Sequence, residues 1–354
     1  MLKRSKTVKE KDAIQSALTA LKNCLEQVPF LETELIQVSN PDNGPDITVK
    51  VRIRDEERYL FVEVKNVGQP RIARLATYQI RDFLRQRPNA YGIFMAPYIS
   101  QEAGKICEES GIGYLDLAGN CLLSFDTVYI RQTGAINNNV QKRVLRSIYS
   151  PKGERILRVL LTHPKRNWKI AELAQAADVS LGQVVNIKKL LLDREWLREP
   201  TQGITLANPS ALLDEWSQSY NFQRNKAIEC YALAEIPEIE AKVAEACRML
   251  DLGYALTGFS SAARIAPMVR YQKASIYING NPSSLLETLG WKTVPSGSNV
   301  SLLVAYDEGV FFGGKEIDSI NIVSQVQTYL DVQNIRGRGQ EAANAIRSEM
   351  EKTW

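Results

Sequence analysis

The first third of the chain alternates amphipathic helices with short strands. Apolar residues recur at helical spacing through residues 11–28, 71–87 and 100–111, and a strand is expected near residues 34–39. Strict alternation in "DITVKVRI" and "YLFVEVK" predicts two half-buried strands, 46–53 and 59–65, which the charged turn "RDEER" joins as an antiparallel pair. Further strands are expected over 91–98, 113–119 and 120–130. This order predicts an α/β sandwich over residues 1–135.

The remaining two thirds divide into a helical part and a second mixed part. The polar, Gly- and Asn-rich segment 131–142 is a predicted linker, and residues 141–220 are predicted to form helices followed by a short hairpin. In 226–354 we expect helices over 226–250, 260–269 and 339–352, with strands over 253–258, 274–280 and 299–306. The prediction is therefore an α/β multidomain protein with domains at 1–135, 141–220 and 226–354.

Composition excludes several kinds of chemistry. Five cysteines are dispersed without CxxC spacing, and the single histidine, His163, precedes a proline in an expected loop. No zinc finger or HExxH site can be built from them. An odd set of scattered cysteines and the lack of an apolar run of about 18 residues predict a reduced, cytoplasmic protein without a membrane helix.

Charge is concentrated in the helical part. The whole chain carries a net charge of only +4, but residues 141–200 hold thirteen Lys or Arg against six Asp or Glu. A local basic excess of this size is typical of a module that binds phosphates. The rest of the chain is close to neutral.

Two carboxylates and a lysine converge at one end of the predicted hairpin. Glu63 and Lys65 are two residues apart, so their side chains leave the same face of one strand. Asp46 begins the other strand and lies opposite the end of its partner if the hairpin pairs about its turn. Two carboxylates there can hold Mg²⁺, and a lysine can orient water and offset the charge of a phosphate.

The string Pro45-Asp46 followed by Glu63-Val64-Lys65 resembles the PD-(D/E)xK motif of restriction-endonuclease-like nucleases. The resemblance covers about residues 10–135 and implies Mg²⁺ or Mn²⁺ held by Asp46, Glu63 and the carbonyl of Val64, with Lys65 catalytic. A helix-borne acid often completes such a site, and Glu34 is the candidate. Two alternatives stay open: a solvated strand face, and a nuclease-like domain that binds DNA without cleaving it.

The helix expected after this hairpin carries basic residues on one side. At about 100° per residue they fall in one narrow sector with Tyr78 among them, and such a stripe suits a phosphate backbone. A solvated helix face is the alternative. Gln79, on the same helix, could approach the metal site. The residues of the stripe are Arg71, Arg74, Arg81 and Arg85.

The middle of the chain resembles the winged helix-turn-helix of bacterial transcription regulators. "KIAELAQAADVSLGQVVNIKKLLLDREWLRE" predicts two helices about a tight turn with Ser180 as N-cap, and "EWLREPTQGITLAN" predicts the wing. The resemblance covers about residues 150–208 and implies a recognition helix in the major groove. Gly182 and Val185 offer little base-specific hydrogen bonding, and protein contacts are the alternative role. The candidate DNA-binding residues are Gln183 and Asn186 for bases, and Lys169, Lys188, Lys189 and Arg198 for phosphates.

The C-terminal part carries two further resemblances. "YALTGFSSAARIAPMV" followed by "ASIYIN" is similar to a nucleotidyltransferase core, but the strand offers Ser275, Tyr277 and Asn279 where that chemistry needs metal-binding acids, so a degenerate copy is expected. "YALTGFSSAARIAP" and "VSQVQTYLDVQNIRGRGQEAANAIR" together resemble the AbiEi family over about 145–350. That family comprises antitoxin-regulators of type IV toxin–antitoxin systems. An interaction or dimerisation domain is the alternative.

The AbiEi resemblance implies an autorepressor that binds double-stranded DNA. It also implies that the cognate toxin is a nucleotidyltransferase encoded alongside and neutralised without a lasting complex. The nuclease-like N-terminal domain departs from the simplest members of that family. The first hypothesis is thus a DNA-binding transcriptional regulator or antitoxin, expected to be a homodimer on a palindromic site. The alternative is a Mg²⁺-dependent DNA endonuclease targeted by its winged helix, for defence or on mobile DNA. A scaffold with two inert α/β domains is the third.

Overall fold

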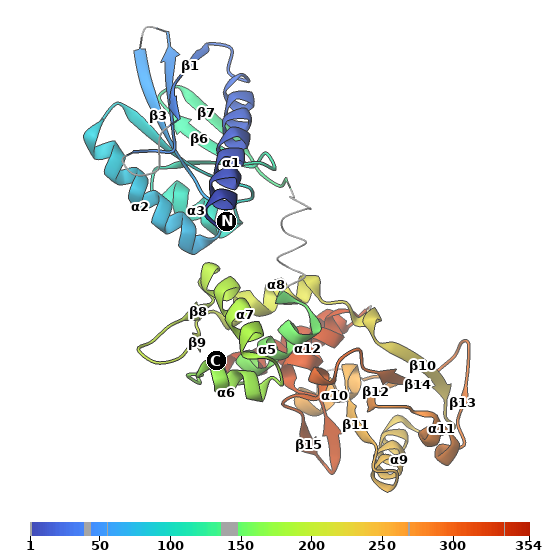
Figure 1. The fold of residues 1–354 in the computed structure, drawn as a ribbon. Helices are drawn as coiled ribbons and strands as arrows, with labels where there is room; N and C mark the ends of the chain where they lie inside the picture. The colour runs from blue at the N-terminus through green and yellow to red at the C-terminus, as the bar shows by residue number, and fades with distance from the viewer. Residues whose placement is uncertain (1, 39–43, 55, 136–147, 268–269, 336) are drawn as a thin grey trace. The chain divides into compact units, whose positions relative to one another are not determined.

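The computed structural model describes residues 2–38, 44–54, 56–135, 148–267, 270–335 and 337–354 (Figure 1). The chain divides into two compact units, which are described separately. The first unit comprises residues 1–144 with 192–195, and the second comprises 145–191 with 196–354. The predicted second and third domains thus fall almost entirely within one unit. The α/β class that the sequence predicts is confirmed in both.

The first unit is built on one seven-stranded sheet whose strands lie in chain order. The first three strands pair antiparallel, the middle three pair parallel, and the last three pair antiparallel again. The strands are β1 (Leu31–Val38), β2 (Ile47–Ile53), β3 (Glu56–Val64), β4 (Ala90–Ala96), β5 (Gly113–Asp116), β6 (Cys121–Phe125) and β7 (Val128–Gln132).

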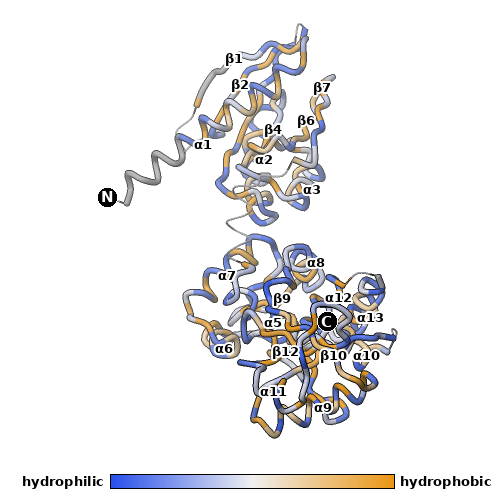
Figure 2. The backbone as a smooth tube through the Cα atoms, turned by 90° about the vertical axis from the view of Figure 1, so that its right-hand side faces the viewer, coloured by the Kyte–Doolittle hydropathy of each residue, from blue (hydrophilic) through white to orange (hydrophobic). Residues whose placement is uncertain are grey.

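Helices cover both faces of this sheet. α1 (Leu2–Leu25) packs Leu21 and Leu25 on one face, and α2 (Pro70–Gln86) and α3 (Gln101–Glu109) pack on the other. Pro70 opens α2, where a missing N–H costs nothing, and Ser100 caps α3 by accepting the N–H of Ala103. Hydrophobic residues concentrate on the central strands, including β4 (Figure 2).

The register of the β2–β3 hairpin brings its two polar ends together. Ile47 pairs with Val62, so Asp46, one residue earlier, lies opposite Glu63. Facing residues on adjacent antiparallel strands project to the same side of a sheet. The predicted convergence of these two carboxylates is therefore present.

Two predictions in this unit are wrong in detail. The single strand expected over 120–130 is a hairpin of β6 and β7, and Asp126 turns the chain with φ of 49°. Aspartate tolerates this left-handed conformation because its short side chain bonds locally, and the prediction did not give it that role. The expected linker at 131–142 begins inside β7, and most of it lies outside the described residues.

The second unit begins with three helices and a short hairpin, called here the three-helix segment, residues 151–206. Its elements are α5 (Pro151–Thr162), α6 (Ile170–Ala176), α7 (Leu181–Asp193), β8 (Leu197–Arg198) and β9 (Thr205–Leu206). Asp178, with φ of 49°, closes α6, and the Val179 N–H returns to the carbonyl of Ala174. Ser180 starts α7 by accepting the N–H of Gln183 at 3.2 Å, as predicted.

The rest of the second unit is a mixed seven-stranded sheet with helices on both faces. Ile239 and Val243 of α9 pack on one face with Leu285 of α11, and Tyr277 and Leu303 lie on the other. Across the sheet the strands are β13 (Lys292–Thr293), β10 (Lys226–Tyr231), β14 (Val300–Val304), β12 (Ala274–Asn279), β11 (Gly253–Leu256), β16 (Ile320–Ile322) and β15 (Lys315–Ile317). The helices are α8 (Pro209–Ser219), α9 (Ile236–Met249), α10 (Gly258–Ile265), α11 (Ser283–Leu289), α12 (Gln325–Gln333) and α13 (Gly339–Glu351), with 3-10 turns at Phe222–Arg224 and Glu308–Phe311.

One predicted helix in this unit is wrong in its first half. Residues 226–231 form β10, which pairs with β14 and β13, and only 236–249 form a helix. Pro237 lies in the first turn of α9, where proline favours a helix start. Sheet pairing with residues some seventy positions later is decided by tertiary contacts, which local periodicity does not contain.

A buried ion network joins the three-helix segment to the C-terminal sheet. Arg158 of α5 is fully buried, and its Nη2 donates to Gln327 Oε1 at 2.7 Å and to Tyr306 Oη at 3.1 Å. Glu154, one turn earlier, accepts from Arg224 at 2.8 Å and from the Tyr306 hydroxyl. Burial raises the pKa of Glu154, while Arg158, Tyr306 and Arg224 oppose the shift. The charged form of the Glu154 carboxyl is therefore stabilised by Arg158 and Arg224.

The same network continues beneath the sheet. Asp331 of α12 is fully buried and accepts from Tyr220 Oη at 2.7 Å, from Gln327 Nε2 at 2.9 Å and from the Thr257 hydroxyl. Burial raises the pKa of Asp331, and these three donors counter the shift. Side chains of α5 and α12, together with Tyr220 after α8 and Thr257 before α10, are thus held in one arrangement, and Tyr277 of β12 lies against Gln327.

Arg158→Ala is expected to lower the free energy of unfolding by about 3–5 kcal/mol, because it leaves the Gln327 carbonyl buried without its donor and removes a cation from beside the buried Glu154 carboxylate. Chemical denaturation measures the change. Lys152→Ala on the exposed side of the same helix is the control and should change stability by less than about 0.5 kcal/mol. Equal denaturation midpoints for Arg158→Ala and the wild type would contradict the structural role of the network.

Candidate functional site

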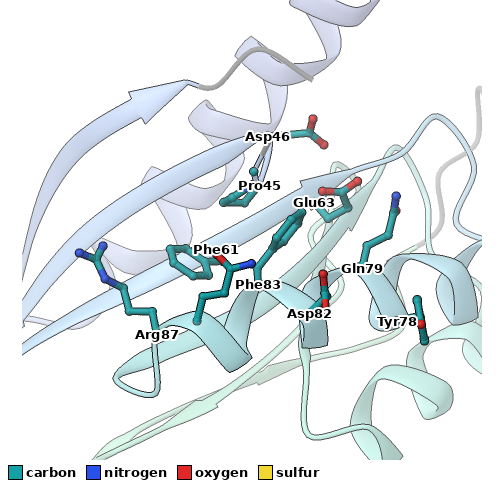
Figure 3. A pocket seen from close by; sticks show the side chains of 11 residues that line it. Pro45, Asp46, Phe61, Glu63, Tyr78, Gln79, Asp82, Phe83 and Arg87 are labelled. Atoms are coloured by element: carbon teal, nitrogen blue, oxygen red, sulfur yellow. The ribbon is translucent and has the colours of Figure 1, made fainter. Parts of the chain in front are cut away.

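A cavity of about 610 Å³ opens where the β2–β3 hairpin meets α2 (Figure 3). Its floor carries the two strand-end carboxylates, and its wall is made by one side of α2. Gln79 extends from that helix toward the strand end that bears Glu63. The lining residues are Gly44, Pro45, Asp46, Phe61, Glu63, Tyr78, Gln79, Asp82, Phe83, Gln86 and Arg87.

Backbone pairing and an ion pair hold the acidic groups in place. Asp46 Oδ2 accepts the Val64 N–H at 2.7 Å, which ties the start of β2 to the end of β3. Lys65 Nζ donates to Glu63 Oε1 across the same strand face. Glu63 and Lys65 are therefore in direct contact, and Asp46 bonds to the backbone of Val64, which lies between them. The alternation of the strands predicted this proximity.

Glu63 is poorly solvated and lies near a second negative charge. Its side chain is 7% exposed, and burial raises the pKa of this carboxyl. The Lys65 ammonium lowers that pKa, while the charge of Asp46 raises it further. The net direction is upward, so the site disfavours two bare carboxylates.

The donor set fits a hard divalent cation that keeps several waters. Asp46 and Glu63 present carboxylate oxygens to one cavity, and a cation there would relieve the repulsion that raises the Glu63 pKa. Over the part of the chain that the structure describes, no group of three or more His, Cys, Asp and Glu side chains could hold a metal ion. Any such ion would thus rest on two carboxylates, with the Val64 carbonyl as the implied third ligand.

Glu34 does not complete this site. It lies on the edge strand β1, not on a helix, and its partner in the register is Lys50, well along the hairpin from Asp46. Its side chain is exposed. The candidate fails because the register of β1 on β2 places Glu34 opposite Lys50, four residues along β2 from Asp46. Asp82 of α2 is the other acid in the cavity wall.

The basic stripe of α2 is exposed as its spacing predicted. Arg71, Arg74, Arg81 and Arg85 all lie on the solvent side, and Tyr78 among them is 74% exposed. Two of the arginines have weak local partners: Arg81 donates to the Ser110 carbonyl at 3.3 Å, and Arg85 lies 3.6 Å from Asp82. Because Tyr78 also lines the cavity, the stripe and the carboxylate site adjoin.

In the three-helix segment, α7 buries Val184, Ile187 and Leu191 and turns its other side to solvent. Asn186 and Lys189 are exposed there, whereas Gln183 is half-buried at the flank. Lys188 pairs with Glu199 at 2.5 Å, so its charge is locally offset. Lys169, before α6, and Arg198, on β8, are exposed.

The C-terminal sheet places β12 at its centre. Tyr277 is fully buried and bonded to Asn225 at 3.1 Å, while Ser275 is half-buried and Asn279 is exposed. Strand β12 contains no Asp or Glu. The buried acid near it is Asp331 of α12, a residue that the sequence pattern did not indicate. Its spacing within α12 gave no signal, because its partners come from distant parts of the chain.

Glu63→Gln is expected to abolish binding of Mn²⁺ while leaving the melting temperature equal or higher, because the amide avoids the penalty that raises the Glu63 pKa. Isothermal calorimetry and thermal unfolding measure the two effects. In the wild type, Mn²⁺ affinity should fall as pH is lowered, and the fall should begin above the range of an ordinary glutamate. Glu57→Gln, at the other end of the hairpin, is the control. Retained Mn²⁺ binding in Glu63→Gln would contradict the assignment.

Comparison with curated proteins and with solved structures gives no match to this chain. Among the described residues, every helix is too short or too polar to cross a membrane. Residues 205–352, from β9 to the end of α13, match the family model described as "Transcriptional regulator, AbiEi antitoxin, Type IV TA system". The C-terminal part of the chain is therefore similar to the AbiEi antitoxin family.

Proposed function

We propose that this chain is a DNA-binding transcriptional regulator and antitoxin of a type IV toxin–antitoxin system. The match of residues 205–352 to the AbiEi model is the observation that carries the proposal. The family description names both roles, transcriptional regulation and antitoxin activity. In this proposal the chain comprises a nuclease-like domain at 1–135, a winged helix at 141–220 and an AbiEi-type domain at 226–354.

The three-helix segment supports the DNA-binding role. It has the element order of a winged helix: two helices about a tight turn, then a hairpin whose loop contains Gly203 with φ of 97°. α7 would be the recognition helix in the major groove. The exposed Lys169, Lys189 and Arg198 would contact phosphates, in keeping with the basic excess of residues 141–200.

The buried network supports joint action of this segment and the AbiEi-type part. Arg158 and Glu154 on α5 bond to Tyr306, Gln327 and Arg224, all of which lie within the matched residues. A change in the C-terminal sheet could thus reach the DNA-binding helices through fixed hydrogen bonds. The expected toxin is a nucleotidyltransferase encoded alongside, neutralised without a lasting complex, and the expected active form is a homodimer on a palindromic promoter site.

Lys169→Ala should weaken binding to the chain's own promoter duplex and to unrelated duplexes by a similar factor, because a phosphate contact does not depend on sequence. It should also reduce the slope of log affinity against log salt concentration by about one. Gel-shift titrations at several salt concentrations give both numbers. Lys292→Ala, an exposed lysine of β13, is the control and should leave affinity and slope unchanged. If the wild type binds no duplex at low salt, the regulator proposal fails.

A second function is favoured by one specific observation: Asp46 and Glu63 line a cavity beside the arginine stripe of α2, and Lys65 pairs with Glu63. We propose on that basis a Mg²⁺-dependent DNA endonuclease as the alternative. Asp46 and Glu63 would hold the cation, which when bound supplies Lewis-acid stabilisation of the phosphate. Lys65 would orient the attacking water, and Gln79 would position the DNA strand. The arginines of α2 would hold the flanking phosphates.

Incubation with supercoiled plasmid and Mg²⁺ or Mn²⁺ tests this alternative. If the site is active, the wild type nicks or linearises the plasmid, and Lys65→Ala and Glu63→Ala lose at least about a hundredfold in rate. Arg85→Ala should weaken substrate binding and retain cleavage at saturating DNA. A wild type that shifts the plasmid without cutting it would leave the N-terminal unit a DNA-binding domain and would exclude the endonuclease.

A further inference from the structure

The outward face of α7 is apolar and small where a DNA-reading helix usually carries long polar side chains. Val185 is 52% exposed and Leu181, four residues earlier, is 56% exposed. Gly182 lies beside them in the first turn, and Asn186 and Lys189 complete the face. At 100° per residue, Gly182, Val185, Asn186 and Lys189 lie within one exposed sector.

Within the described residues, neither packing nor backbone conformation requires a glycine at position 182. A Cβ added to it would meet only Ser180 Oγ, at 4.0 Å, and its backbone is not left-handed. Glycine inside a helix is less favourable than alanine because it loses more backbone freedom on folding. The fold would therefore gain from an alanine here, and the glycine indicates that something outside the chain approaches the helix closely.

The chemistry of this face points to one kind of base pair. α7 contains no arginine, and its first turn contains no lysine, so the bidentate contact that reads guanine is missing from the part of the helix that enters a groove first. Thymine offers a C5-methyl group to the major groove, which apolar side chains contact, and adenine offers N6 and N7 to an amide. Val185 and Leu181 match the first, and Asn186 matches the second.

We propose that α7 reads A·T base pairs. Val185 and Leu181 pack on thymine methyl groups, Asn186 bonds adenine, and Gly182 lets the helix backbone come close to the base edges. This inference rests on the proposed DNA-binding function and names its sequence preference. The preference arises from shape and apolar contact, which a search for polar base-reading residues overlooks.

The test begins with selection of preferred duplexes from a random library by the full-length protein. The selected duplex is then compared with the same duplex in which each thymine of the half-site is replaced by uracil, which removes only the methyl group. Fluorescence anisotropy should show binding about three- to tenfold weaker for the uracil duplex. Val185→Ser should show a smaller difference between the thymine and uracil duplexes than the wild type, because Leu181 remains to contact the methyl groups.

Gly182→Ala separates a binding role from a structural one. It should melt at the same temperature as the wild type or higher, and it should bind the selected duplex at least about tenfold more weakly. Lys189→Ala is the matched control on the same face: it should weaken the thymine and uracil duplexes by the same factor.

The outcomes distinguish this inference from the function on which it rests. Tight binding with equal affinity for thymine and uracil overturns the A·T reading and leaves the regulator intact. A lower melting temperature for Gly182→Ala overturns the close-approach role, as does unchanged affinity. Failure of the wild type to select or bind any duplex overturns both, and an α7 face that serves a protein partner would give that result.

Discussion

The second unit depends on the burial of a single positive charge. A guanidinium taken out of water is destabilising unless acceptors surround it, and Arg158 bonds to Gln327 and Tyr306 from far along the chain, with the carboxylate of Glu154 one turn earlier on its own helix. The side chains that accept from Arg158 also act as donors: Gln327 donates to Asp331, and Tyr306 donates to Glu154. The arrangement leaves α5 and α12 little freedom to shift independently, and it makes two parts that the sequence separates behave as one body.

Local patterning predicted what depends on neighbouring residues. The helices at 70–86 and 181–193 and the β2–β3 hairpin have strong periodicity with turn or cap signals at their ends, and they form where expected. The proximity of Asp46, Glu63 and Lys65 followed from the same alternation, because a hairpin that pairs about its turn determines which residues face each other.

The failures at β10 and Glu34, and the burial of Arg158 and Asp331, have one physical origin. β10 is a strand because β14, seventy residues later, pairs with it, and nothing within 226–231 encodes that partner. Glu34 lies opposite Lys50 because β1 pairs with β2 in that register, and the sequence of β1 does not specify the register. Arg158 and Asp331 look like ordinary polar positions of two helices, and their burial is a property of how the helices pack. Long-range contacts decide all four cases.

The distance along the chain between the members of the network has a consequence for synthesis. Arg158 and Gln327 are 169 residues apart, so a ribosome completes α5 long before the acceptor of its guanidinium is made. During that interval α5 cannot take up its final burial, because the charge would be left without its amide partner. A prematurely terminated chain that contains the whole three-helix segment would therefore hold that segment in an unfinished, protease-sensitive state. Only chains completed through α12 would therefore hold the three-helix segment in its final packing.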